Sequence, residues 1–494
     1  FSDPRSSSPT MPNSKHRTGV DATQNSQSTL PEVIESLGTG FAQIRMALLT
    51  GPVWFADSAV FLLVSSINDA ISREWNFSAA QRGMIVTMVY MGVLVGNLLS
   101  GPFSDLSGRR LPILVSFFFL FIFNTLSALC WGFFCLCFVR FLVGVAMGVG
   151  QPAQQALVSE TTPTKWRIII SSIGMFLFAS GEVYSSVLVL VDSPDMQDLH
   201  WRTLLIAGAL PLVIFGLLSK AFLNESPLFL ACGGRYEETR VVLESMQQDN
   251  RAWDVCIDFR PHQMPRKGSG VQNRFLQTLR IIFGPEHLVL TLILMMSCFT
   301  LNICFHGSLY AFPNVLAKGI DMGSSAAAAL IYGGLLETAG YAGGVLCILY
   351  FRRIMVMKIY LASMATALTA FAWGASYHGD ESFFFQFLAM YGYYASKFSI
   401  AIGFLIFFLY TSEVYPTPVR ATGTAVVFAG GRVAAMLGAP IYELFLVVFG
   451  RFDIFFWMLA ALCTINFWLT TFLTIETFGR VLVDVKDDPE EGAL

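Results

Sequence analysis

Five charged side chains stand inside stretches of sequence that are otherwise apolar: Asp57, Glu182, Glu337, Lys397 and Arg432. A charge at membrane depth costs about 2.5 kcal/mol or more unless it is paired or faces water. Each is therefore a candidate for holding a substrate or a proton. The alternative is structural, with Lys397 and Arg432 each neutralising one of the acids, which leaves one acid over.

A polar stripe follows one face of the apolar stretch at 287–310. Asn302, His306 and Tyr310 stand at positions i, i+4 and i+8, so a helix would carry all three on the same side. Such a stripe can line a cavity that holds a ligand. The alternative is a histidine that is simply hydrogen-bonded in a helix core.

The composition requires a membrane. Hydrophobic residues make up 54% of the chain and charged residues 13%, with a mean hydropathy of +0.60, more apolar surface than a soluble fold of this length needs to bury. The net charge of −3 offers no basic face for nucleic acid. The cysteines have no zinc spacing and no phosphate-binding loop is present, so we expect no metal and no cofactor.

The elements that must position the charged residues are twelve apolar spans, each long enough for a hydrocarbon core that needs about 20 residues. They fall into two groups of six around a polar segment. We therefore predict an all-α membrane protein with this organisation: a disordered cytoplasmic tail at 1–40, a six-helix bundle at 41–223, a cytoplasmic central loop at 224–285, a second six-helix bundle at 286–475 and a cytoplasmic tail at 476–494.

One short sequence occurs twice, in equivalent places of the two groups. Ser159 to Arg167 and Ser412 to Arg420 both read S-E-x-x-P-T-x-x-R, and each joins the fourth and fifth spans of its group. The duplication supports two related halves. Its charged residues are Glu160, Arg167, Glu413 and Arg420.

Basic residues set the orientation. Arginine and lysine are concentrated in the connections after the second, fourth, eighth and tenth spans and in the central segment. Because short cytoplasmic loops carry an excess of Lys and Arg, both termini are expected in the cytosol.

The connection between spans 2 and 3 carries a recognisable motif, in which Gly101, Asp105, Gly108 and Arg109 form the pattern G-x-x-x-D-x-x-G-R-R. It resembles the signature loop of the major facilitator superfamily, as R-x-x-x-G-x-x-x-G beginning at Arg140 resembles a second pattern of that superfamily. The resemblance implies that Asp105 and Arg109 latch the two halves on the cytoplasmic side, in a gate with Gly101, Gly108, Arg140 and the four charges of the duplicated sequence. Gly101 is expected to allow close helix approach.

Residues around Asp57 and the stretch Glu413-Val414-Tyr415-Pro416-Thr417 are similar to the synaptic-vesicle-protein-related branch, whose relatives carry organic ions or carboxylates such as nicotinate. The resemblance implies two pseudo-symmetric bundles, a midplane site and alternating access. Helix 1 lines the cavity of this fold, so a desolvated carboxylate at Asp57 suits proton exchange. Glu182 and Glu337 are the next proton candidates, and either acid could instead hold a cation.

The expected function is secondary active transport of a small organic ion, coupled to protons, by a monomer in the plasma membrane or a vesicle membrane. Arg432 or Lys397 would meet an anionic substrate, and the acids a cationic one. Two alternatives stay open: a sugar porter, and a non-transporting receptor or regulator that keeps the fold. The protein is not expected to be an enzyme.

Overall fold

The computed structural model describes residues 28–260, 280–285, 287–318, 320, 322–377, 383–415 and 420–477, apart from the side chains of Ile168, Arg420 and Ala421. Its regular elements are helices. The predicted tails lie largely outside these residues, as does the Pro416 to Val419 part of the second repeat.

Twelve helical segments among the described residues are long and apolar enough to cross a membrane, as the sequence predicts. Pro52 starts a new helix within the first span, where its missing N–H is tolerated. The spans are formed by α3 (Phe41–Thr50) with α4 (Pro52–Trp75), α5 (Ala79–Ser107), α6 (Arg110–Ala128), α7 (Phe133–Thr161), η1 (Thr164–Trp166) with α8 (Arg167–Asp192), α9 (Trp201–Phe222), α13 (Leu288–Leu316), α14 (Ala326–Tyr350), α15 (Arg353–Ser376), α16 (Phe383–Val414), α17 (Arg420–Phe449) and α18 (Asp453–Leu469) with η2 (Thr470–Phe472).

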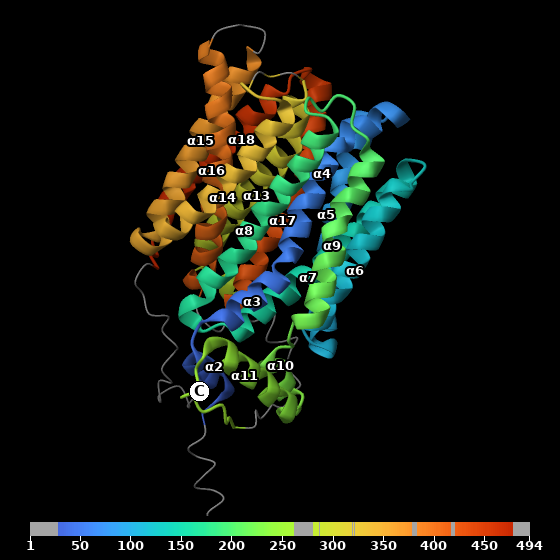
Figure 1. Cartoon of the computed structure of the whole chain (residues 1–494). Helices are drawn as coiled ribbons and strands as arrows, with labels where there is room; N and C mark the ends of the chain where they lie inside the picture. Colours follow the sequence, from blue (N-terminus) through green and yellow to red (C-terminus); the bar gives the residue numbers. More distant parts are fainter. Residues whose placement is uncertain are drawn as a thin grey trace, which may run out of the picture.

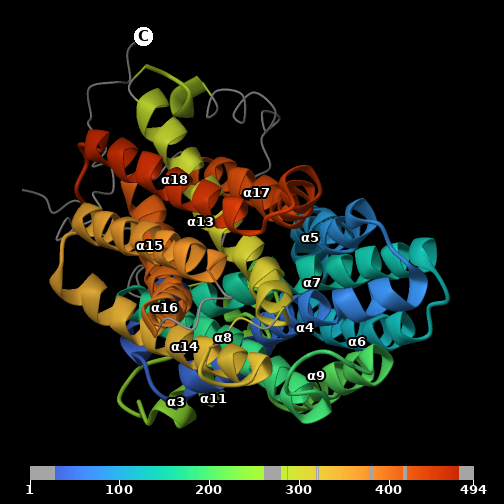
Figure 2. The same ribbon diagram turned by 90° about the horizontal axis from the view of Figure 1, so that it is seen from above.

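The helices pack as two equivalent sets, α3 to α9 (the first set) and α13 to α18 (the second set). Within the first set α5 packs on α7, α4 on α8 and α6 on both α7 and α9; the second set repeats this with α14 on α16, α13 on α17 and α15 on both α16 and α18. The sets meet where α8 packs on α14, α5 on α17 and α4 on α13 (Figure 2). Each cross-set contact has its counterpart when the sets are exchanged, which is the pseudo-symmetry expected of the fold.

A small helical layer lies against one end of the bundle (Figure 1), made of α2 (Leu30–Leu37), α10 (Pro227–Cys232) and α11 (Tyr236–Asn250). We call this end the α11 end. The layer has its own apolar core, in which Val33 and Leu37 meet Leu243 and Met246. Arg45 of α3 forms an ion pair with Asp249 of α11 at 2.8 Å, which attaches the layer to the spans.

The structure differs here from the expected tail and loop. Residues 30–37 form a helix because Leu30, Val33, Ile34 and Leu37 follow helical spacing and are all buried. The Glu32 carboxylate accepts a hydrogen bond from the Thr29 backbone N–H at 2.8 Å, which caps the first turn. Within the expected central loop, α10 and α11 occupy most of residues 227–250.

Candidate functional site

A central cavity of about 120 Å³ lies where the two sets meet. Its wall comes from α4, α7 and α8 of the first set and from α13, α14, α16 and α17 of the second. The wall is largely aromatic, and its polar groups are few. They include Asp57, Gln155, Asn302, His306, Tyr341 and Arg432.

Asp57 and Arg432 face the cavity from opposite sets and are joined through one glutamine. The Gln151 amide Nε2 donates to Asp57 Oδ2 at 2.7 Å, and Gln151 Oε1 accepts from Arg432 Nη2 at 3.3 Å. Asp57 is 5% exposed, and its other oxygen, Oδ1, is buried without a hydrogen-bond partner. A carboxylate in that position can take up a proton or meet a donor from a ligand.

Three further charged side chains of the predicted set form one buried triad across the two sets. Lys397 Nζ lies 2.6 Å from Glu182 Oε2 and 3.0 Å from Glu337 Oε2. Glu182 comes from α8, and the other two come from α14 and α16. Tyr341, which lines the cavity, donates from its hydroxyl to Glu337 Oε1 at 3.2 Å. The triad thus stands directly behind the cavity wall and shares one ammonium between two carboxylates.

The polar stripe on α13 divides between two places. Asn302 and His306 line the central cavity, and Nδ1 of His306 lies 2.6 Å from the hydroxyl of Tyr90 on α5. Tyr310 instead donates to Glu443 Oε1 at 2.5 Å and accepts from Asn68 Nδ2 at 2.8 Å. Eight residues of helix span about 12 Å, enough to move Tyr310 beyond the cavity although it shares a face with the other two.

At the α11 end, the signature-loop arginine belongs to a cluster within the first set. Arg109 Nη2 lies 3.0 Å from Glu160 Oε1, and Nη1 lies 3.7 Å from Asp105 Oδ1. Glu225 Oε1 accepts from the Arg109 backbone N–H at 2.8 Å, and the Ser226 hydroxyl donates to Glu160. We call Arg109, Glu160, Glu225 and Ser226 the first-set cluster.

The second set repeats this arrangement with residues that the sequence analysis singled out only in part. Arg353 Nε lies 3.4 Å from Glu413 Oε2, and the Arg353 backbone N–H donates to Glu476 Oε1 at 2.9 Å. The Thr477 hydroxyl donates to Glu413 Oε2 at 2.6 Å. Arg353, Glu413, Glu476 and Thr477 form the second-set cluster. The equivalence of Arg109 and Arg353 is visible in the sequence only once the duplication is followed beyond its nine residues.

Three expected gate residues have other surroundings. Arg140 is 1% exposed, and its Nη1 donates to Asn124 Oδ1 at 3.2 Å. Twenty residues of α7, about 30 Å, separate it from Glu160, so Arg140 does not join the first-set cluster. Arg167 donates from Nε to the Thr162 carbonyl at 3.1 Å. A Cβ placed on Gly101 would meet no heavy atom within 4 Å, so the expected close helix approach is not made there.

Close approach occurs instead at the glycines that follow Arg140. A Cβ on Gly144 would lie 2.0 Å from the Val89 carbonyl oxygen, and one on Gly148 would lie 2.3 Å from that of Val93. These glycines let α7 pack directly on the backbone of α5. The spacing R-x-x-x-G-x-x-x-G therefore serves helix packing in this structure.

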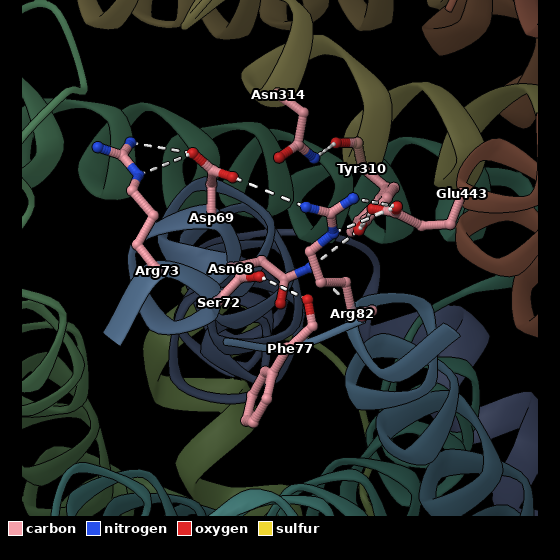
Figure 3. Close-up of polar contacts among 9 residues, drawn as sticks. All are labelled: Asn68, Asp69, Ser72, Arg73, Phe77, Arg82, Tyr310, Asn314 and Glu443. Carbon is pink, nitrogen blue, oxygen red and sulfur yellow. Dashed lines mark hydrogen bonds and ion pairs between the residues drawn. The ribbon is translucent and has the colours of Figure 1, made fainter. Parts of the chain in front are cut away.

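At the end of the bundle away from α11, which we call the opposite end, polar contacts join the two sets (Figure 3). Arg82 of α5 lies 2.8 Å from Glu443 of α17, and the same carboxylate accepts from Tyr310. Glu443 is 3% exposed. We call Asn68, Arg82, Tyr310 and Glu443 the opposite-end network. The sequence analysis missed Glu443 because it lies near the end of its span, where a charge is ordinary.

The comparisons with known proteins agree with this architecture. A family model described as "Sugar (and other) transporter" matches residues 11–488. The chain belongs to this family. As a member of it, within the major facilitator superfamily, the protein is a multi-pass membrane transporter of a small molecule and not an enzyme, which confirms these expectations.

Two relatives and one solved structure are similar to this chain over most of its length. The chain is 26% identical to the synaptic vesicle 2-related protein of Xenopus laevis, over 91% of this chain and 81% of the relative. It is 24% identical to organic cation/carnitine transporter 7 of Arabidopsis thaliana, over 84% and 87%. The partially occluded inward-open xylose transporter XylE of E. coli is 17% identical, with a TM-score of 0.69, over 90% of this chain and 99% of XylE. That structural similarity establishes the fold alone.

Proposed function

We propose that this protein is a secondary active transporter that moves a small organic ion by alternating access and couples the movement to protons. The observation that carries the proposal is the central cavity, where ionisable groups from both sets meet at the surface along which the sets would separate. Asp57 enters from α4 and Arg432 from α17. A change in protonation or ligand binding there alters contacts between the sets, as alternating access requires.

The acid–lysine triad provides a second place where a proton can couple to this movement. Glu182 belongs to the first set and its two partners to the second, so separation of α8 from α14 would break the contact at 2.6 Å. With all three groups ionised, one negative charge remains in excess in a buried site. A proton bound to either carboxylate removes that excess, but only a proton on Glu182 weakens the attraction that holds the sets together, because Glu337 and Lys397 belong to the same set.

We infer that the α11 end faces the cytosol. The basic residues of the connections support this orientation through the positive-inside rule. In the described structure the first-set and second-set clusters each join helices of one set, whereas the opposite-end network joins the two sets. This arrangement suits a state in which the cavity opens toward the α11 end. The clusters would then meet to close that end in the other state. We place the protein, as a monomer, in the plasma membrane or a vesicle membrane.

The proposal is tested by uptake into proteoliposomes. Labelled nicotinate and labelled tetraethylammonium are supplied with and without an inward proton gradient, to wild type, to Asp57→Asn and to Arg202→Gln. Arg202 pairs with Glu74 at 2.9 Å away from the cavity and serves as the control. We expect gradient-driven uptake of one ion, a fall of about 100-fold or more in Asp57→Asn, and no change in the control. Uptake that ignores the gradient would contradict proton coupling; competition by glucose would favour a sugar porter.

A further inference from the structure

Arg432 carries the permanent charge of the cavity. A guanidinium stays protonated in proteins, whereas a carboxylate becomes neutral when it binds a proton. No carboxylate of the described residues is within 4 Å of Arg432, and its hydrogen bond is the 3.3 Å contact to the Gln151 amide. Most of its five N–H donors are therefore available to a ligand. The cavity has a permanent positive charge and a removable negative one, which favours an anionic substrate.

The other acids near the cavity contact Lys397 and do not line the cavity. Glu182 and Glu337 both contact Lys397 and lie behind the wall formed by Tyr341. An organic cation in the cavity would therefore meet an unpaired arginine, and Asp57 is the carboxylate among the described lining residues that it could contact directly. A carboxylate of the substrate could instead take the bidentate geometry that guanidinium groups prefer.

The size and lining of the cavity restrict the rest of the molecule. A cavity of about 150 Å³ lined by apolar side chains holds benzene, and the volume here is about 120 Å³. Trp54, Phe178, Phe305 and Phe404 line it. Aromatic walls and a volume close to that of one ring suit a single planar ring better than a flexible chain or a polyhydroxylated sugar.

Asp57 then determines what travels with the anion. It shares the Gln151 amide with Arg432, so a substrate carboxylate bound to Arg432 would lie close to the carboxylate of Asp57. The two carboxylates would repel each other while Asp57 is ionised. A proton on Asp57 removes the repulsion and supplies a donor. The charged or titratable groups of the neighbouring helices at the level of the cavity include Tyr90 of α5, Glu182 of α8, His306 of α13 and Arg432 of α17. Arg45 of α3 pairs with Asp249, α6 and α9 carry their charges near helix ends, and Arg140 of α7 contacts Asn124.

We propose that the substrate is a small planar monocarboxylate whose carboxylate binds Arg432, and that it crosses together with one proton carried by Asp57, so that transport is electroneutral. This inference rests on the proposed transport function and names its substrate class and stoichiometry. No bond is made or broken; one proton and one anion enter and leave the cavity together.

The first test measures binding to the full-length protein in detergent, using one ring in three charge states: nicotinate, nicotinamide and the cation 1-methylnicotinamide, with benzoate as a second ring. Nicotinate or benzoate should bind at least about tenfold more tightly than the amide and the cation. Arg432→Gln should remove that advantage and lower amide binding far less than carboxylate binding, and Arg432→Lys should restore part of the advantage. Equal or tighter binding of the amide or the cation, or no binding of either carboxylate, would overturn the proposal.

The second test asks whether the substrate anion crosses together with a proton, so that no net charge moves. Carboxylate affinity should rise as the pH falls through a range in which the probe stays ionised, and Asp57→Asn should bind with a flat pH profile. Uptake above that of protein-free vesicles should follow an imposed pH difference and ignore a potassium diffusion potential. Uptake that follows the potential would refute the electroneutral step. Proton-driven uptake of the cation alone would refute the substrate class yet retain the proposed function, while sealed vesicles that take up neither ion would count against both.

Discussion

At the scale of single residues, Gln151 links the two charged groups of the cavity, Asp57 and Arg432. It is 3% exposed, and its amide donates to Asp57 while accepting from Arg432. An amide can satisfy an acid and a guanidinium at once because it has a donor and an acceptor on one planar group. A carboxylate at the same place could pair with Arg432 but would repel Asp57.

Gln151→Glu is therefore expected to occupy Arg432 permanently and to weaken carboxylate binding by about tenfold or more. The matched control is Gln155→Glu, which adds the same charge to the cavity wall one turn along α7. Isothermal titration with nicotinate compares the two variants. Equal losses in both would mean that the cavity responds to net charge and not to the contact with Arg432.

At the scale of elements, the turn between α5 and α6 requires glycine at one position of its motif and tolerates a side chain at another. Gly108 has φ +90°, and a Cβ there would lie 2.2 Å from the Glu225 carboxylate. Glu225 is the group that accepts from the backbone N–H of Arg109. Gly101 lies in the helix and faces open space. The same motif thus contains a structural glycine and its own control.

Gly108→Ala should lower the free energy of unfolding by about 1–3 kcal/mol, because it combines a strained backbone with displacement of Glu225. Gly101→Ala should change it by no more than about 1 kcal/mol, in the stabilising direction, because alanine favours helix. Thermal unfolding of the purified variants measures both. A Gly101→Ala variant as unstable as Gly108→Ala would show that close packing at Gly101 matters in another state of the protein.

At the scale of the whole molecule, the sequence predicts the spans and their two groups, because apolar length and a duplicated turn are local signals. It also singles out Asp57, Glu182 and Lys397, since charges inside apolar stretches are conspicuous. It does not reveal that Lys397 meets both Glu182 and Glu337, because that pairing depends on how distant helices pack. Gln151 carries no charge and gives no such signal. Tyr310 shares a helix face with His306, but the face alone does not say how far along it the cavity extends.

The opposite-end network is the part of the whole molecule whose loss should shift the balance between its two open states. Opening that end requires α5 and α17 to separate, and Glu443 would lose Arg82 while keeping Tyr310 of its own set. Glu443→Gln keeps the shape of the side chain but removes the charge that holds Arg82, so the state closed at this end loses stability. We expect its population relative to the other state to fall by about tenfold, for a coupling of about 1.4 kcal/mol.

The control is Glu74→Gln, which removes an acid at the same end that pairs with Arg202 inside the first set. Distances between spin labels on the α4–α5 and α17–α18 loops report the change: a longer distance should become populated in Glu443→Gln and not in Glu74→Gln. If the distance distribution of Glu443→Gln matched that of wild type, packing between α5 and α17 would suffice to hold this end closed, and the buried carboxylate would stabilise the second set through Tyr310 and not the balance between states.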